Sequence, residues 1–270
     1  MNRAFIRHLI LLLWICVSSA SAQVSVSPLY TRVELNEVGQ AQATFSVSNG
    51  STDPVRFRAS FLPFDLTGPS LELGQESSAS ESDLSPYLRA APLEFEVPPS
   101  GEQVIRVIAL VPPSAIETEL RAALVIEPLT DVTTPLESVE DEVSGQVLYT
   151  YRFIAQIYMN QAGSQSSLDI NDVVYDSENG LSVNYFNTGL TSGIGSTSWE
   201  LMKDDQVLLK SQEPNRFIVL PKGTRTGIIS QDLTLEPGEY TLTGIFGTED
   251  GGEPPVVLDP QPFTKTFTVK

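Results

Sequence analysis

The chain has 270 residues, of which 16 are basic and 34 acidic, so its formal net charge at neutral pH is −18. A surface this acidic repels nucleic acid and anionic lipid, and neither is expected as a partner. The only Cys and the only His are Cys16 and His8, so the rest of the chain has no thiol or imidazole for catalysis or metal binding, and no cofactor is expected.

The first 22 residues have the features of a secretory signal peptide. A basic start that includes Arg3 and Arg7 precedes the apolar run Leu9–Val17, and small residues lead to Ala22. The run is too short to span a bilayer. We therefore expect residues 1–22 to be removed on export, which leaves a mature protein that has no membrane span and carries two fewer positive charges.

The next part of the chain alternates apolar and polar residues between turn residues, a pattern typical of strands. Val24–Leu35 is predicted as a strand in which Pro28 marks an edge or a switch between two sheets. Glu119–Ile126 is predicted as a strand or as a short helix, because its Glu-Leu-Arg-Ala-Ala-Leu run has helix propensity. Further strands are expected at Gln40–Ser48, Val55–Leu66, Leu93–Val97 and Gln103–Val111.

The stretch Gln146–Met159 differs from the other predicted strands. It is rich in aromatic and β-branched residues and contains neither Pro nor Gly, which favours a strand with both faces at least half buried. It is also much longer than the usual strand of about 5–6 residues. A small sheet covers such a strand poorly, so part of it is expected to be an edge with which another chain pairs.

The small, polar segment Gln161–Ser167 is predicted to link two domains, over residues 23–160 and 168–270. In the second domain, Asn179-Gly180 has the composition of a hairpin turn, and Leu235–Tyr240 resembles a tyrosine corner. The regular spacing of turn residues, without a long amphipathic helix, predicts an all-β chain of two sandwiches. Strands of the second sandwich are expected at Leu168–Tyr175, Leu181–Phe186, Ser196–Met202, Gln206–Lys210, Phe217–Leu220, Arg225–Ser230, Tyr240–Phe246 and Phe263–Val269.

Residues 24–160 resemble the periplasmic chaperones of pilus and fimbria assembly, the PapD type. The resemblance depends on the order and spacing of several short motifs, none of which is specific alone. The motifs are Val24-x-Val26, Tyr30-Thr31-Arg32, Phe45–Asn49, Pro98–Val107 and Glu119-Leu-Arg121, followed by the long last strand. The second domain is similar in type, with Val219–Arg225 and Leu235–Tyr240 as the matching pieces.

The resemblance implies two immunoglobulin-like domains joined in an L, and a protein that binds rather than an enzyme. Such chaperones act in the periplasm, where they lend the last strand of the first domain to pilin-like or fimbrial subunits. Basic residues between the domains hold the carboxylate at the end of the subunit, because a buried carboxylate needs a charge-assisted partner. An outer-membrane usher is a further partner that the resemblance suggests.

Arg32 matches the arginine that anchors the subunit's carboxylate in this family. The second anchor of the family is a lysine that falls near Ala155, where this chain has no lysine. Arg152 is the only basic residue in the last strand, and it can replace the lysine only if the register differs by a few residues. The candidate side chains for pairing with the subunit's strand are Val147, Tyr149 and Tyr151.

Several of these residues also have a plainer interpretation. Arg32 can line the cleft without a special role, and the aromatic residues of the last strand can pack in their own core. Glu119 matches a position that the family uses for structural ion pairing. The acidic loops 68–84 and 130–142 are interpreted as solvated, and Asp176–Gly180 lacks the spacing of a calcium loop.

An alternative of a different class is a structural or adhesive immunoglobulin-like protein of the envelope, whose strands are all paired internally and which holds no client. A pair of carboxylates that hydrolyses sugars is a more distant alternative, because the sequence does not place two of them about 5–10 Å apart. Co-purification with small subunits would separate the chaperone from the structural protein.

Overall fold

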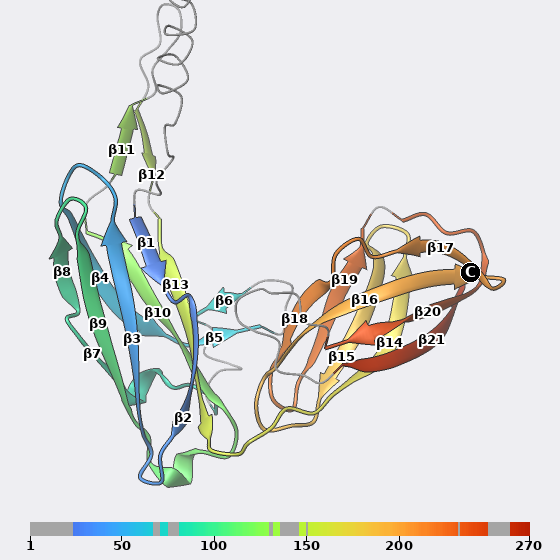
Figure 1. The fold of residues 1–270 in the computed structure, drawn as a ribbon, viewed down its shortest axis with the longest axis horizontal. Helices are drawn as coiled ribbons and strands as arrows, with labels where there is room; N and C mark the ends of the chain where they lie inside the picture. Colours follow the sequence, from blue (N-terminus) through green and yellow to red (C-terminus); the bar gives the residue numbers. More distant parts are fainter. Residues whose placement is uncertain are drawn as a thin grey trace, which may run out of the picture.

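The structure is a computed structural model that describes residues 24–66, 71–74, 81–129, 151–231, 233–247 and 260–270, and the backbone of strands 132–135 and 146–149. Two β-sandwiches form the arms of a bent molecule, and β13 (Phe153–Gln161) leads from the first to the second (Figure 1). The predicted signal peptide lies outside the described residues. No helix of the described part is long and apolar enough to cross a membrane.

Two sheets form the first sandwich, and their buried residues share one core. One sheet contains, in spatial order, β1 (Val24–Ser27), β3 (Gln40–Asn49), β9 (Glu102–Leu110) and β7 (Leu88–Ala91). The other contains β2 (Tyr30–Leu35), β13, β10 (Leu120–Pro128), β4 (Val55–Leu62) and β8 (Glu94–Val97). The short elements are β5 (Phe64–Asp65), β6 (Glu72–Leu73), η1 (Ser85–Tyr87) and η2 (Pro113–Ala115).

The first predicted strand changes sheets where the sequence indicated. β1 and β2 belong to opposite sheets, and Pro28 lies between them. This position suits Pro, which cannot donate a hydrogen bond within a ladder. β2 runs parallel to β13, with Arg32 opposite Tyr158. Because of the switch, β2 forms the edge strand of the sheet that faces the second domain.

The ambiguous segment at Glu119–Ile126 is a strand, not a helix. β10 lies between β13 and β4, and its first seven residues are buried. Ala122, Leu124 and Ile126 belong to the core of the first sandwich, whereas Ala123 and Val125 belong to a second apolar cluster on the other face of the sheet. Burial on both faces outweighs the helix propensity of this run, because propensity differences between such residues are small.

The prediction of one continuous strand over Gln146–Met159 is wrong. β12 (Gln146–Tyr149) pairs with β11 (Val132–Pro135), and the ladder stops before β13 begins at Phe153. The β11–β12 hairpin projects beyond the sandwich (Figure 1). The opposite sheet therefore does not extend over the hairpin. Arg152, which lies between β12 and β13, is exposed. The prediction of acidic loops over 68–84 and 130–142 is wrong in part, because these ranges contain the strands β6 and β11, and their other residues lie partly outside the described ones.

The second sandwich also has two sheets around one core. One contains β14 (Leu168–Asp176), β15 (Gly180–Asn187) and β19 (Thr224–Ser230). The other contains β17 (Gln206–Lys210), β16 (Gly193–Lys203), β20 (Gly238–Phe246) and β21 (Gln261–Val269), and β18 (Asn215–Val219) also pairs with β16.

Two predicted turn features of this sandwich are confirmed. Gly180 has a φ of 78° at the turn between β14 and β15, a conformation that Gly adopts readily. The hydroxyl of Tyr240 donates to the carbonyl of Glu236 at 2.7 Å, which is the contact of a tyrosine corner.

Candidate functional site

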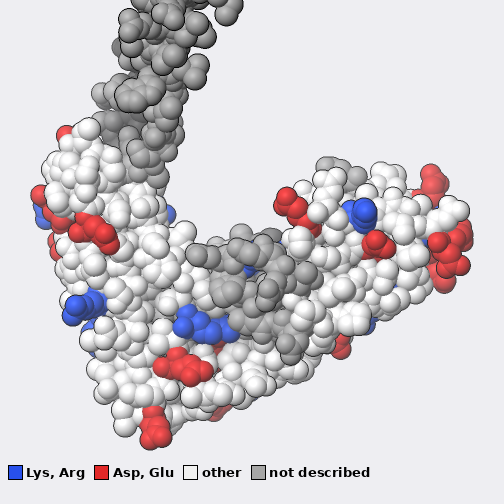
Figure 2. Space-filling view, in the orientation of Figure 1, with Lys and Arg blue, Asp and Glu red and all other residues white. Residues whose placement is uncertain are grey.

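An apolar cluster fills the bend between the two sandwiches. We call it the junction cluster, and its buried members are Phe64, Leu66, Ala123, Val125, Tyr158 and Leu220. All but Leu220 come from the first domain, whose second sheet turns its outer face towards the second domain. In the view of Figure 2, acidic side chains gather at the free end of the second domain, whereas basic and acidic side chains lie next to one another near the bend.

Three polar residues form a row across the strands that face the bend. Tyr158 of β13 lies directly opposite Arg32 of β2 on one side and Arg121 of β10 on the other. The Arg32 guanidinium lies 5.9 Å from the centre of the Tyr158 ring, and that of Arg121 lies 6.0 Å from the centre of the Phe64 ring. The two cations thus rest on aromatic faces, where a guanidinium can be buried at lower cost.

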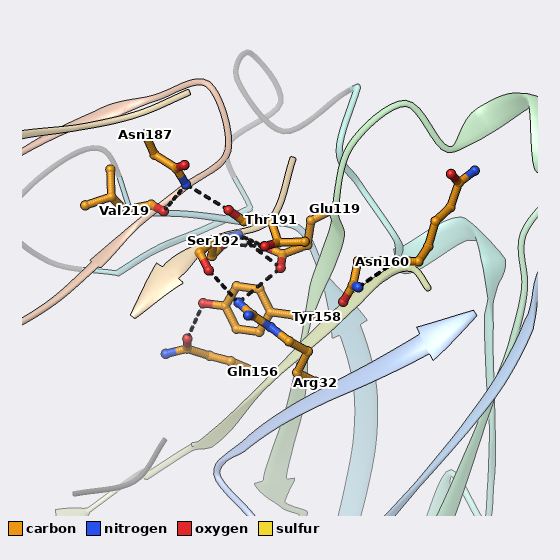
Figure 3. A network of polar contacts seen from close by, with 10 residues as sticks. Arg32, Glu119, Gln156, Tyr158, Asn160, Asn187, Thr191, Ser192 and Val219 are labelled. Carbon is orange, nitrogen blue, oxygen red and sulfur yellow. Dashed lines mark hydrogen bonds and ion pairs between the residues drawn. The ribbon is translucent and has the colours of Figure 1, made fainter. Parts of the chain in front are cut away.

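Arg32, Glu119 and Ser192 connect the two domains, and we call them the junction network (Figure 3). Arg32 Nη2 lies 3.2 Å from Glu119 Oε2 and donates to the Ser192 carbonyl at 2.8 Å. The Ser192 amide lies 3.2 Å from both carboxylate oxygens of Glu119, and its hydroxyl donates to Oε1. A charge pair of the first domain therefore holds a loop of the second.

The loop that carries Ser192 is itself fixed by two sets of hydrogen bonds. The side-chain amide of Asn187 donates to the carbonyls of Thr191 at 2.8 Å and Val219 at 3.0 Å. The Glu119 amide donates to the Leu190 carbonyl at 2.9 Å. Ser192 is fully buried, so its place opposite Glu119 is set from both domains.

Burial dominates the electrostatics of the junction. It raises the pKa of the fully buried Glu119 carboxyl, although the nearby Arg32 charge opposes the rise. It lowers the pKa of Arg121, and the charge of Asp65 is the largest opposing influence. It also raises the pKa of the Tyr158 hydroxyl well above its usual value. Charged groups at this site are therefore costly unless they are paired.

An open pocket of about 560 Å³ lies beside Arg121, and both domains line it. Its charged lining residues are Glu81, Asp83, Glu117, Arg121 and Lys222. Three carboxylates against two cations make this pocket a poor site for an anion. The cation that is best placed to meet a carboxylate is Arg32, which points into the bend.

The structure brings Arg32 to the bend but does not bring Arg152 there. Arg152 lies six residues before Tyr158, which corresponds to roughly 20 Å of extended chain. Its Nε is 3.2 Å from Glu127 Oε2, and 56% of its side chain is exposed. Ala155, near which the family's lysine was placed, is fully buried in the core of the first domain. The residues of β13 closest in register to Arg32 are Tyr158 and its neighbours.

The side chains of Val147 and Tyr149 lie outside the described residues. Tyr151 is half buried and packs against the core of the first domain, with its ring 5.4 Å from that of Phe153. Ala155, Ile157 and Met159 face the same core, whereas Tyr158 belongs to the junction cluster and the partly buried Ile154 packs against it. The role of Val147, Tyr149 and Tyr151 in pairing with a client stays a prediction.

One edge of this last strand is open within the described part of the chain. β2 pairs with β13 only from Gln156 to Gln161, so Phe153–Ala155 pair with β10 alone. Among the strands that the structure describes, β12 pairs with β11 alone. Unpaired backbone groups at such an edge can accept another strand.

The sequence did not indicate Tyr30, Tyr158, Arg121 or Ser192 as residues of the site. The partners of Arg32 depend on the register of β2 against β13 and on the approach of the second domain, and neither can be derived from periodicity. The one local signal for further site residues was Tyr30, which lies next to Thr31-Arg32, because a Tyr hydroxyl needs a polar partner when it is buried.

The fold is similar to those of solved chaperones. It matches the YadV chaperone with a TM-score of 0.52 at 9% identity, over 92% of this chain and 100% of that one. It matches a complex of the Salmonella enterica SafA pilin with the SafB chaperone with a TM-score of 0.50 at 12% identity, over 93% of this chain and 99% of that one. No family model and no curated protein matches the sequence. The matches span both sandwiches, and the chain has the two-domain immunoglobulin-like fold of these chaperones.

Proposed function

We propose that this protein is a periplasmic chaperone, a divergent member of the PapD type, that binds pilus or fimbrial subunits or similar exported subunits by lending them a β-strand. The observation that carries the proposal is the open edge of β12 and Phe153–Ala155, which leads into a bend that contains Arg32. The proposed activity is binding, and no reaction is involved. An outer-membrane usher is the expected recipient of the client.

Backbone groups supply the first part of the proposed interaction. A client strand that aligns with the open edge extends the β8–β4–β10–β13 sheet by one strand. From Phe153 onwards, the odd-numbered side chains face the chaperone's own core. We therefore assign the opposite face, which includes Arg152 and Ile154, to the client. This assignment differs from the set Val147, Tyr149 and Tyr151 that the sequence suggested.

Arg32 supplies the second part as the anchor for the carboxylate at the end of the client. Its charge lies at the junction end of β13, on the strand that borders the bend. In the free protein its Nη2 already contacts Glu119 and Ser192. A client carboxylate therefore either shares Arg32 with the Glu119 carboxylate or displaces that carboxylate from Arg32. Until a client binds, the pair with Glu119 keeps the guanidinium oriented.

Coexpression tests this function directly. The protein is exported to a bacterial periplasm together with a candidate fimbrial subunit from the same bacterium. The proposal expects the two to copurify in a one-to-one complex and the subunit to be degraded when expressed alone. If the subunit is equally stable without the protein and no complex forms, the structural alternative is favoured.

A pair of variants locates the contact. Ile154→Asp places a carboxylate on the face assigned to the client and is expected to abolish copurification, because an unpaired charge in an apolar groove is costly. Ile228→Asp makes the same change at an exposed residue of β19 in the second domain and is expected to have no effect. Melting curves of both variants are needed, because Ile154 packs against the junction cluster and only an Ile154→Asp variant that remains folded tests the contact.

A further inference from the structure

We propose that β17, at the edge of the second sandwich, pairs antiparallel with β17 of a second copy of this chain and so forms a dimer. The inference does not rest on the proposed function. β17 (Gln206–Lys210) lies at the end of the second domain that points away from the bend (Figure 1). A dimer formed there leaves the bend and the open edge at Phe153–Ala155 accessible.

The backbone of β17 has an open edge. β17 is the outermost strand of its sheet and, among the described strands, pairs only with β16. The ladder contains a β-bulge, because successive residues of β16 lie opposite Leu209 and Val207, and Leu208 between them has no residue of β16 opposite it. Unpaired backbone groups along such an edge can pair with another strand.

The centre of β17 is apolar and exposed. Val207 and Leu208 are each 50% exposed and Leu209 is 37% exposed. Within the described part of the chain, no residue of β17 belongs to, or packs against, any of the three apolar clusters. Proteins usually protect an open edge with charged residues, but here three consecutive apolar residues occupy the middle of the strand. Such a surface is typical of an interaction site.

The charges at the two ends of β17 favour a second copy as the partner. Asp204 and Asp205 form the turn before the strand, and Lys210 ends it. None of the three forms an ion pair with another described residue. In antiparallel pairing centred on Leu208, Lys210 of each copy lies opposite Gln206 of the other and next to the acidic turn of that copy.

The two-fold symmetry of the antiparallel pair makes this contact twice. Parallel pairing would instead place the two lysines side by side and the two acidic turns side by side, which is unfavourable. The order of residues along the strand, from acidic through apolar to basic, is therefore complementary to itself in the antiparallel direction only.

The dimer is expected to be weak. A strand of five residues covers much less than the roughly 1,200 Å² of a stable interface. Acidic side chains also gather at this end of the molecule and repel one another across the dimer (Figure 2). We expect a dissociation constant on the order of 10–500 μM.

Sedimentation equilibrium of the exported protein tests the association up to a concentration of about 1 mM. The mean mass of the wild type is expected to rise towards that of two chains. Leu208→Lys places like charges opposite each other and is expected to keep the protein monomeric. Leu110→Lys makes the same change at an exposed Leu of β9 in the first domain and is expected to associate like the wild type.

Disulfide formation tests the register. Residues 23–270 contain no Cys, so an introduced Cys is the only one after export. Leu208→Cys is expected to form a linked dimer on mild oxidation, because directly opposite residues of antiparallel strands have Cα atoms about 4.5–5.5 Å apart. Gln206→Cys and Lys210→Cys are expected to link to each other when mixed, but neither is expected to link to itself.

The outcomes decide between the occupants of this edge. A wild-type mass that stays that of one chain, or a Gln206→Cys protein that links to itself as readily as Leu208→Cys does, would overturn the proposal. If the protein is monomeric and the β17 amides are nevertheless protected from hydrogen exchange, the edge is covered within one chain, and the dimer is wrong. If they are protected only with a bound subunit, the client covers this edge, and the dimer is again wrong. Leu208→Lys is expected to capture the subunit as the wild type does, so failure of the dimer leaves the proposed function intact.

Discussion

The two ends of β13 differ in how much of the strand the protein itself uses. At the junction end, Tyr158 is fully buried, and the backbone pairs with β2 on one side and β10 on the other. At the outer end, Phe153–Ala155 pair with β10 alone among the described strands, and the preceding Arg152 is exposed. The same strand is therefore a fixed structural element at one end and an available edge at the other, as strand donation from a rigid base requires.

The largest expected effect tests the fixed end. Tyr158→Ala removes a fully buried aromatic side chain from the junction cluster and is expected to lower the free energy of unfolding by about 3–5 kcal/mol. Tyr151→Ala, the matched change near the outer end, is expected to cost only about 1 kcal/mol, because that ring is half buried. Urea denaturation measures both, and similar losses at the two positions would contradict the comparison.

The next effect concerns the junction network. Arg32→Met keeps an apolar stem but leaves the Glu119 carboxylate buried without its cation. The loss of a buried pair costs about 3–5 kcal/mol. We expect on the order of 2–3 kcal/mol here, because 21% of the Arg32 side chain is exposed and Ser192 still donates to Glu119. Unchanged stability in urea would mean that the pair does not hold the domains together.

A pH titration examines the same network more finely. Burial raises the pKa of Glu119 above its ordinary 4.5, so the folded protein holds this proton more tightly than the unfolded chain does. For this group alone, stability is fully present below pH 4.5 and falls as the pH rises from 4.5 towards the raised pKa. The free energy of unfolding of the wild type should therefore fall relative to that of Glu119→Gln as the pH rises through this window. A difference that does not depend on pH, or one of opposite sign, would contradict it.

The smallest effect is expected at the outer end. Arg152→Ala breaks an ion pair with Glu127 between partly exposed side chains. Such surface pairs contribute about 0–1 kcal/mol and are screened by salt. A loss of more than about 2 kcal/mol in urea would show that this end is also a fixed part of the fold and would weaken its assignment to a client.

Features with local causes could be predicted from the sequence. The switch between sheets at Pro28, the turn at Gly180 and the tyrosine corner at Tyr240 each depend on a few neighbouring residues, and each is present in the structure. The two-domain all-β architecture follows from the spacing of turns along the chain. β7 was missed, because Leu88–Ala91 is a short run without clear alternation.

Features that depend on long-range packing could not be predicted. The end of the ladder after Tyr149 reflects the limit of the opposite sheet, which the composition of Gln146–Met159 does not encode. Arg32 was identified as a site residue, but Ser192 lies 160 positions along the chain from it and meets it only when the second domain is in place. The separation of Arg152 from Arg32 likewise depends on the register of β13 against β2.

Hydrogen exchange of the amides at Phe153–Ala155 tests the central claim most directly. It compares the free protein with its complex with the coexpressed subunit. In the free protein, the Ile154 amide should exchange rapidly, because it points away from β10 as the Gln156 amide does, whereas the amides at Ile157–Met159 should be protected by pairing on both sides. On subunit binding we expect protection of the Ile154 amide and no change at Ile157–Met159. If a complex forms and the Ile154 amide exchanges as rapidly as before, the client does not pair with this edge, and strand donation is contradicted.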